Sequence, residues 1–307
     1  MAIIKITTDG DPYPAFAGVD VLGQPVNSGN RVFVGQNTEI ADQSKVYSIN
    51  YRGGEGGKIL SNGDRETLPG TPTPVELNEP VGVTLNGVPI YTSAVQISWE
   101  DDEDAGTGLT WDSQSPLNST RFSFDLCDGA SEGEEIEYRY RGNAFFVNGF
   151  TNNETLRDAS PYYKNTSFNG NYLAHPQEID NNGAVTFTGG HSKIVGFALD
   201  GYPIYGPFGY SDANDPTSSV IRMKSGYEEK EILPEGRGDL AAGAYVEDYV
   251  HVADSASDVL DEHNGRFCIT PDFKNGTYAY FLTYADNNLS TPAYPYIIGT
   301  STKEVRS

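Results

Sequence analysis

The chain holds four histidines, at positions 175, 191, 251 and 263, and one of them stands beside other residue types used in catalysis. His191 is followed by Ser192, and Asp200 lies further along the same predicted strand. Nine residues of extended strand span about 30 Å, so these three side chains cannot form a Ser/His/Asp triad by themselves. We therefore interpret His191 as a structural residue, bonded to backbone or to a tyrosine. The alternatives are a metal ligand, together with His175 or a carboxylate, and a catalytic base.

A second candidate site is the acidic run Glu-Asp-Asp-Glu-Asp at residues 100–104. Asp101, Asp102 and Asp104 offer the hard oxygen ligands that Ca²⁺ prefers. The run does not match a twelve-residue EF-hand loop, so a solvated acidic loop is the simpler interpretation and a Ca²⁺ site is the alternative. The chain contains no P-loop, no G-x-S-x-G, no H-E-x-x-H and no dinucleotide fingerprint. We accordingly predict no catalytic residue and no cofactor.

Cys127 and Cys268 are the only cysteines of the chain. Their separation fits neither a zinc site nor a C-x-x-C redox motif. Two interpretations stay open. The cysteines form a disulfide, or they are two buried free thiols, as is usual in proteins that are not exported.

A repeated phrase indicates the elements that position these residues. Residues 82–91 and 196–205 share the pattern G-x-x-L-[N/D]-G-x-P-I-Y. Asn86-Gly87 and Asp200-Gly201 occupy the same place in the two copies, and these residue types adopt the positive φ of a two-residue turn at low cost. We predict two equivalent β-hairpins, which is evidence for architecture rather than for an active site.

The composition favours many short strands joined by turns. Hydrophobic residues make up only 37% of the chain, and 34 Gly and 18 Pro punctuate it. We predict a mainly β fold, with an antiparallel β-sandwich or barrel-like core that contains the repeated hairpin. Helix is expected only in short turns, one of them at residues 257–263, opened by Ser257 and ended by Asn264-Gly265.

A proline-rich stretch is the best candidate for a boundary. Four prolines fall between residues 69 and 80, where they favour an extended connector. This divides the chain into a β-rich N-terminal docking segment at 1–66, a linker at 67–80 and a main domain at 81–307.

The formal charge of −23 excludes some partners. Nucleic acid needs a basic footprint, and anionic membrane surfaces repel an acidic chain. No stretch approaches the roughly twenty apolar residues of a membrane helix. The N-terminus begins with an alternating strand rather than a signal peptide, so we expect synthesis in a cytoplasm without export.

Several motifs in the second part of the chain resemble those of a known family. They are the run Gly190-His-Ser-Lys-Ile-Val-Gly-Phe-Ala-Leu-Asp-Gly-Tyr-Pro-Ile-Tyr-Gly-Pro-Phe-Gly209, Asn264-Gly-Arg-Phe-Cys-Ile-Thr-Pro271, Asn275-Gly-Thr-Tyr-Ala-Tyr-Phe281 and Pro292-Ala-Tyr-Pro-Tyr-Ile-Ile-Gly299. Together, over roughly residues 80 to 300, they resemble the YHYH domain. The resemblance implies a relation to secreted bacterial proteins and to virion structural proteins of marine cyanophages. It implies no established reaction.

The chain departs from the motif that names the family. The slot of Tyr-His-Tyr-His holds Tyr138-Arg139-Tyr140-Arg141, about ten positions after Cys127. A guanidinium stays protonated and cannot ligate a metal, so we expect any histidine-based metal site of relatives to be lost here. The Tyr-x-Tyr alternation survives, as the face of a strand requires.

We expect a non-enzymatic structural component of a phage virion, in the tail, baseplate, fibre or capsid decoration. Its expected place is the virion, after synthesis in the host cytoplasm. The expected partners are other virion proteins in a homo-oligomer or symmetric assembly, with a host surface glycan as a further candidate, and neither nucleic acid nor membrane. The alternatives are an extracellular metal- or glycan-binding module and a hydrolase that uses His191.

Overall fold

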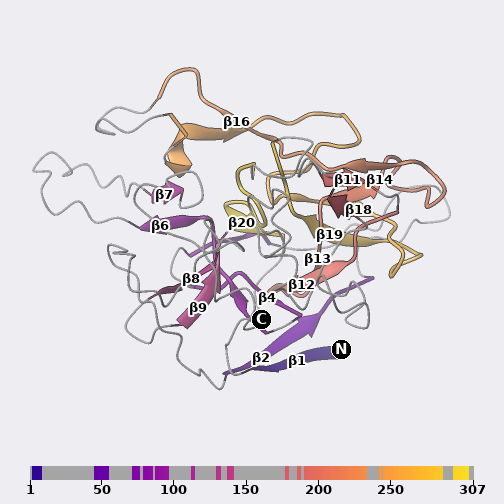
Figure 1. Ribbon diagram of the computed structural model, residues 1–307, viewed down its shortest axis with the longest axis horizontal. Helices are drawn as coiled ribbons and strands as arrows, with labels where there is room; N and C mark the ends of the chain where they lie inside the picture. The colour runs from indigo at the N-terminus through magenta and orange to yellow at the C-terminus, as the bar shows by residue number, and fades with distance from the viewer. Residues whose placement is uncertain are drawn as a thin grey trace, which may run out of the picture.

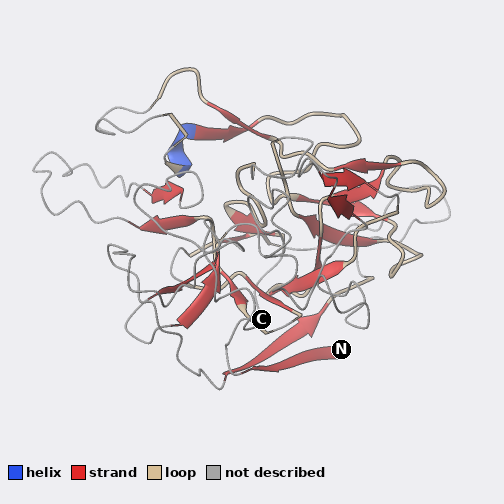
Figure 2. Ribbon diagram, in the orientation of Figure 1, coloured by secondary structure: helices blue, strands red, loops and turns tan. Residues whose placement is uncertain are grey.

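The fold is that of a computed structural model, which describes residues 2–8, 45–54, 71–76, 79–85, 87–96, 112–114, 129–132, 137–141, 177–179, 185–187, 190–233, 242–243, 245–285 and 293–303. These residues form 20 strands and one short 3-10 helix, η1 (Val246–Asp248). Figure 2 shows how strongly strands dominate. The prediction of a mainly β fold is confirmed.

The largest sheet has eight strands in the order β18-β19-β13-β12-β4-β5-β9-β8. Their bounds are β4 (Gly82–Thr84), β5 (Pro89–Ile90), β8 (Gly129–Glu132), β9 (Glu137–Tyr140), β12 (Ile194–Ala198), β13 (Pro203–Tyr205), β18 (Gly265–Cys268) and β19 (Thr277–Phe281). In the part of the chain that the structure describes, this sheet is open at β18 and at β8, so it is not a closed barrel. The sandwich arrangement stays a prediction.

The described residues also form six two-stranded sheets. They are β1 (Ala2–Thr8) with β2 (Lys45–Tyr51), β3 (Thr73–Pro74) with β20 (Ser301–Thr302), β6 (Ala94–Gln96) with β7 (Asp112–Gln114), β10 (Gln177–Ile179) with β11 (Val185–Phe187), β14 (Phe208–Tyr210) with β15 (Val220–Arg222), and β16 (Tyr227–Glu229) with β17 (Tyr249–His251). Figure 1 places β1 and β2 along the lower side of the molecule and β16 along the upper side.

The two copies of the repeated phrase pair their strands in the same register. In the first copy, Gly82 lies opposite Ile90. In the second, Gly196 lies opposite Ile204. The glycine after each turn residue, at 87 and at 201, has a φ of 89° and 98° respectively, which only glycine adopts without strain.

The correspondence extends outward from the two hairpins. β5 runs parallel to β9 with Ile90 opposite Tyr140, and β13 runs parallel to β19 with Ile204 opposite Tyr280. β9 and β19 each pair antiparallel with an outer strand, β8 and β18 respectively. The sheet therefore has a first half (β4, β5, β9, β8) and a second half (β12, β13, β19, β18) with the same strand order and chain order.

The two halves meet at a seam where β4 pairs antiparallel with β12. Val83 lies opposite Phe197 at its centre, flanked by the pairs Thr84 with Gly196 and Gly82 with Ala198. A Cβ added at Gly82 would lie 2.9 Å from the carbonyl oxygen of Phe197, and one added at Gly196 would lie 2.5 Å from that of Val83. Glycine in both copies thus permits the close approach of the two hairpins.

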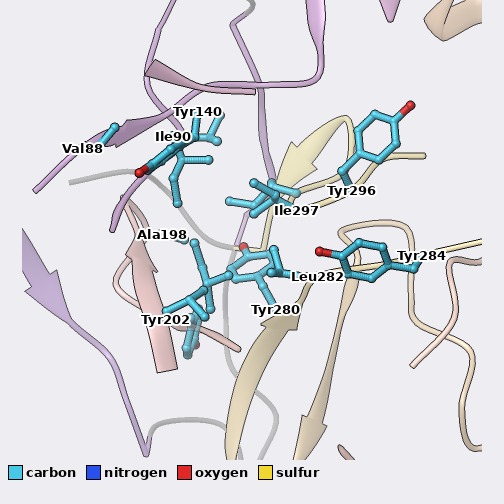
Figure 3. Packing of buried hydrophobic residues seen from close by; sticks show 14 of the residues in the cluster. Val88, Ile90, Tyr140, Ala198, Tyr202, Tyr280, Leu282, Tyr284, Tyr296 and Ile297 are labelled. Atoms are coloured by element: carbon cyan, nitrogen blue, oxygen red, sulfur yellow. The ribbon is translucent and has the colours of Figure 1, made fainter. Parts of the chain in front are cut away.

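One face of the large sheet, which we call the tyrosine face, carries the main hydrophobic core. Because side chains alternate along a strand, Tyr138 and Tyr140 share a face in the first half, and Tyr278 and Tyr280 share it in the second. All four are buried in one cluster with Ile90 and Ile204. Figure 3 shows residues of both halves meeting in this core, with Leu282 and Ile297 packed beside them. The core therefore joins equivalent residues from the two halves.

The ribbon of β1 and β2 contacts the opposite face of the sheet. The amino group of Lys45 forms an ion pair with Glu137 of the first half. At its other end the ribbon reaches the second half, where the ring of Tyr51 lies edge-on to Phe197 at 6.1 Å and the amide of Arg52 donates to the carbonyl of Gly201 at 3.0 Å. The ribbon thus crosses the seam.

The predicted linker at 67–80 contributes a strand of its own. Its residues 73 and 74 form β3, which pairs antiparallel with β20 near the end of the chain. The proposed division at residues 66 and 80 stays a prediction. Among the described residues, no helix is long and apolar enough to cross a membrane.

The helical turn predicted at residues 257–263 is wrong. This segment forms turns and an isolated parallel bridge between Val259 and Lys224 instead of helix. Asp261 accepts hydrogen bonds from the backbone amides of His263 and Gly265 and from the hydroxyl of Tyr278. These contacts fix the segment against Lys224 and β19 and outweigh its weak local preference for helix.

Candidate functional site

Two clusters on the opposite face are built around equivalent tyrosines, Tyr91 and Tyr205, which end the two repeated phrases. In the first cluster the hydroxyl of Tyr91 donates to Glu137 at 2.8 Å. The guanidinium groups of Arg139 and Arg141 lie over the Tyr91 ring, with their carbon atoms 4.2 and 5.3 Å from its centre. Both arginines of the Tyr-Arg-Tyr-Arg segment therefore make cation–π contacts with one tyrosine.

Glu137 is the electrostatic centre of the first cluster. Its side chain is 2% exposed and pairs with Lys45 and with Nε of Arg139, the latter at 2.9 Å. Burial by itself would raise the pKa of Glu137, but the hydrogen bonds from Lys45 and Tyr91 and the charge of Arg139 outweigh it, so this pKa lies below its ordinary value. Burial also raises the pKa of the neighbouring Tyr47 to about 12. The cluster consequently holds an ionised carboxylate among neutral phenols at neutral pH.

The second cluster encloses His191 in aromatic rings. The imidazole lies 5.0 Å from the ring of Tyr205, 4.9 Å from that of Tyr210 and 5.8 Å from that of Phe281, measured between centres. The side chain of Arg266 borders this box, because its Nη2 donates to the carbonyl of Tyr210 at 2.6 Å. His191 is thus buried among aromatic rings, with the positively charged Arg266 beside them.

The hydrogen bonds of His191 define its tautomer. Nδ1 lies 2.7 Å from the carbonyl oxygen of Ser192, which can only accept, so Nδ1 carries the proton. Nε2 is buried and has no hydrogen-bond partner. Burial lowers the pKa of His191 to about 4, although the bond to Ser192 opposes this shift. The ring is therefore neutral at physiological pH.

Besides Tyr91, other buried tyrosines donate hydrogen bonds to carboxylates. Tyr205 donates to Asp272 at 2.9 Å and Tyr280 to Asp200 at 2.6 Å. Burial, followed by the charge of Asp200, raises the pKa of Tyr280 well above its ordinary value. These pairs join residues that are far apart in the sequence and tie strands to turns.

Several of the site residues predicted from the sequence take part in structural contacts of this kind. Ser192 and Asp200 do not form a triad with His191. The Ser192 hydroxyl accepts a hydrogen bond from the amide of Phe208, and Asp200 accepts one from Tyr280. Tyr138 and Tyr140 contact each other edge-on at 5.4 Å on the tyrosine face. Cys268 is fully buried on β18.

The remaining predicted residues lie outside the part of the chain that the structure describes. They are Asn86, Asp101, Asp102, Asp104, Cys127 and His175. The Ca²⁺ site at the acidic run, the disulfide between Cys127 and Cys268 and the pairing of His175 with His191 therefore stay predictions. Within the described ranges, no group of three or more His, Cys, Asp or Glu side chains is placed to hold a metal ion.

The sequence interpretation did not single out Lys45, Glu137, Arg266 or Asp272, which complete the two clusters. One signal was present, since both copies of the repeated phrase end in tyrosine and the two clusters form on Tyr91 and Tyr205. Their partners come from distant segments, and no spacing in the sequence indicates them.

These features define a mainly β protein in which the slot of the family motif lies at β9, beside the outer strand β8, and contacts the end of the first repeated hairpin. The family model described as YHYH protein matches residues 61–292, which is more than half of the chain, so the chain belongs to this family. No curated protein matches the chain, and no solved structure matches it.

Proposed function

We propose that this chain is a non-enzymatic structural component of a phage virion that acts through protein–protein assembly. The observation that carries the proposal is that tyrosine hydroxyls and carboxylates, which could take part in catalysis, instead form hydrogen bonds with one another inside the fold. Tyr91, Tyr205 and Tyr280 each donate to a carboxylate from a distant segment. Such hydrogen bonds stiffen a fold that works by being held among neighbours.

The motif slot supports the same role. Arg139 and Arg141 stand where relatives have histidines, and they stack over Tyr91 while Glu137 is bonded to the N-terminal ribbon through Lys45. A guanidinium can neither ligate a metal nor exchange a proton near neutral pH. In this chain the segment serves packing and the attachment of the ribbon.

The link to a particle rests on the resemblance to YHYH virion proteins of marine cyanophages. On this proposal the chain is part of the tail, baseplate, fibre or capsid decoration, and its partners are copies of itself and other virion proteins. A chain that carries 43 acidic and 20 basic residues suits such contacts better than binding to nucleic acid.

Mass spectrometry of purified virions, combined with partial disassembly, tests the proposal. We expect the chain at a fixed copy number relative to the major structural proteins, released together with one substructure. A chain that stays free in the lysate and is missing from purified particles contradicts the proposal.

A metal- or glycan-binding module is the second candidate, and the orphaned Nε2 of His191 is the observation that favours a metal. Elemental analysis of the purified protein separates the two functions. Stoichiometric zinc or copper that is lost in His191→Phe supports the second candidate, whereas a protein without bound transition metal supports the first.

A further inference from the structure

Among the described residues, two asparagines are followed by glycine, Asn264 and Asn275. In such a pair the glycine nitrogen can attack Cγ of the asparagine, because glycine has no Cβ to hinder the approach. The backbone amide gives up its proton, the bond from Cγ to Nδ2 breaks, and ammonia leaves from a cyclic imide. Water then opens the imide to aspartate or isoaspartate, so the reaction needs no oxidant and no cofactor.

The side chain of Asn264 is locked in the core. It is fully buried, and its Nδ2 donates to the carbonyls of Phe281 at 2.9 Å and of Ile297 at 3.2 Å. Its backbone is fixed as well, with a φ of 65° and a hydrogen bond from its amide to the carbonyl of Asp261 at 2.9 Å. Ammonia can leave only after these bonds break, so the surrounding strands must open first.

The nitrogen that would attack Asn264 is also held. The amide of Gly265 donates to Oδ1 of Asp261 at 3.1 Å, and the hydroxyl of Tyr278 donates to the same carboxylate. A hydrogen bond to a carboxylate stabilises the amide with its proton in place, whereas the attack requires the amide without it. Both partners of the reaction are therefore restrained at this position.

Asn275 has different surroundings, because it lies exposed in the turn between β18 and β19. The amide of Gly276 donates to the carbonyl of Phe273 at 2.9 Å, which closes the turn. This acceptor is a neutral carbonyl rather than a carboxylate. A short surface turn of this kind opens locally, without the unfolding of a buried strand.

We propose that Asn275 is a site of spontaneous deamidation in the folded protein and that the fold protects Asn264 from the same reaction. The two positions share the dipeptide and differ in burial, in the acceptors of the side-chain amide and in the charge of the group that binds the glycine nitrogen. The inference concerns a covalent modification of the chain and does not rest on the proposed role in a virion.

Deamidation of Asn275 changes a turn that carries two tertiary contacts. Asp272 accepts a hydrogen bond from Tyr205 at 2.9 Å, and the ring of Phe273 lies 6.2 Å from that of Tyr51 on the N-terminal ribbon. Aspartate adds a negative charge close to Asp272, and isoaspartate inserts a methylene group into the backbone of the turn. Deamidation should therefore loosen one attachment of the ribbon and lower the melting temperature by about 2 °C.

The test is peptide mass spectrometry of the full chain after incubation at mildly alkaline pH, folded or unfolded in urea. In urea we expect Asn264 and Asn275 to react at similar rates, because each is followed by glycine. In the folded chain Asn275 should react faster than Asn264 by about tenfold or more, since only the turn opens locally. Labelling by an isoaspartate-specific methyltransferase gives an independent readout of the modified position.

Asn275→Gln is the matched variant, because glutamine cyclises much more slowly than asparagine. Incubated wild type should lose melting temperature relative to fresh protein, and incubated Asn275→Gln should lose less. In the folded chain, a rate at Asn275 that does not exceed the rate at Asn264 overturns the proposal. A fall in melting temperature that is as large in Asn275→Gln as in wild type overturns the expected effect on the ribbon.

Discussion

The two halves of the large sheet have the same strand order, and they use one of their faces alike and the other differently. On the tyrosine face, equivalent residues enter one common core. On the opposite face, the first half carries Glu137, Arg139 and Arg141 where the second half carries Thr277, Ala279 and Phe281. The first set holds the N-terminal ribbon through charges, whereas Ala279 and Phe281 join an apolar cluster beside His191.

This difference between the two faces shows which part of the fold must be alike in both halves. The backbone frame and the tyrosine face place the same demands on both halves, because they form the seam and the shared core. The opposite face accepts either charges or apolar rings, provided that the segment packed on it matches. Among the described residues, the exchange of charged for apolar side chains between the two halves thus falls on the opposite face.

The largest expected effect concerns the shared core. Ile90 and Ile204 are equivalent and fully buried, so Ile90→Ala and Ile204→Ala should each lower the free energy of unfolding by about 4 kcal/mol. Urea denaturation measures both. If one substitution costs about 2 kcal/mol more than the other, the two halves do not carry the core equally.

The second-largest effect is the pH dependence of the free energy of unfolding that comes from His191 in the second cluster. Because burial lowers the pKa of His191 to about 4, from an unfolded value of about 6.5, the unfolded chain takes up its proton first as the pH falls. The neutral ring therefore contributes stability at pH 7 that is lost between about pH 6.5 and pH 4, amounting to about 3 kcal/mol.

Denaturation of wild type and His191→Phe at several pH values measures this loss. The variant should lack this part of the pH dependence and keep the part that comes from carboxylates. Parallel pH profiles for the two proteins would show that His191 is not the buried neutral group that the structure indicates.

The third effect concerns the charged cluster of the first half. Glu137→Ala leaves Lys45 and Arg139 without their carboxylate and should lower the free energy of unfolding by about 2.5 kcal/mol, less than for a fully buried pair because both cations keep some contact with water. The equivalent change, Thr277→Ala, removes a neutral hydroxyl and should cost about 1 kcal/mol. Thermal melts rank the two, and equal costs would remove the distinction between the halves.

The smallest effect concerns one internal tie. Tyr280→Phe removes the hydrogen bond to Asp200 and the one accepted from the amide of Lys303 but keeps the ring in the core, so the free energy of unfolding should fall by about 1.5 kcal/mol. Chemical denaturation of this variant is the measurement. A neutral result would mean that water or another donor replaces the phenol at Asp200.

The sequence predicts the local parts of this fold well. The turn dipeptides and the β-branched run before Asp200 depend on neighbours only a few residues apart, and the structure has strands and a positive φ at Gly87 and Gly201 in these places. The family could also be predicted, since its motifs survive in order. Such features follow from steric preferences that each short segment carries by itself.

Contacts between distant segments could not be predicted in this way. Nothing near residue 45 indicates that Lys45 meets Glu137, and the pairing of β4 with β12 joins strands more than a hundred residues apart. The predicted helical turn at 257–263 failed for a related reason, because Asp261 is held by Tyr278 of β19. In each case tertiary hydrogen bonds and charges decide the outcome, and a single sequence gives no signal for them.

The ribbon that crosses the seam has a mechanical consequence. The seam pairs three residues of each strand, and backbone hydrogen bonds from Leu85 to Val195 and from Leu199 to Val81 flank them, so a force that separates the two halves would act on this short stretch. With β2 fixed to Glu137 on one side and to the Gly201 turn on the other, part of that load passes into the ribbon. The N-terminal strands therefore act as a brace, and a pull along the molecule would have to detach them before the sheet could split.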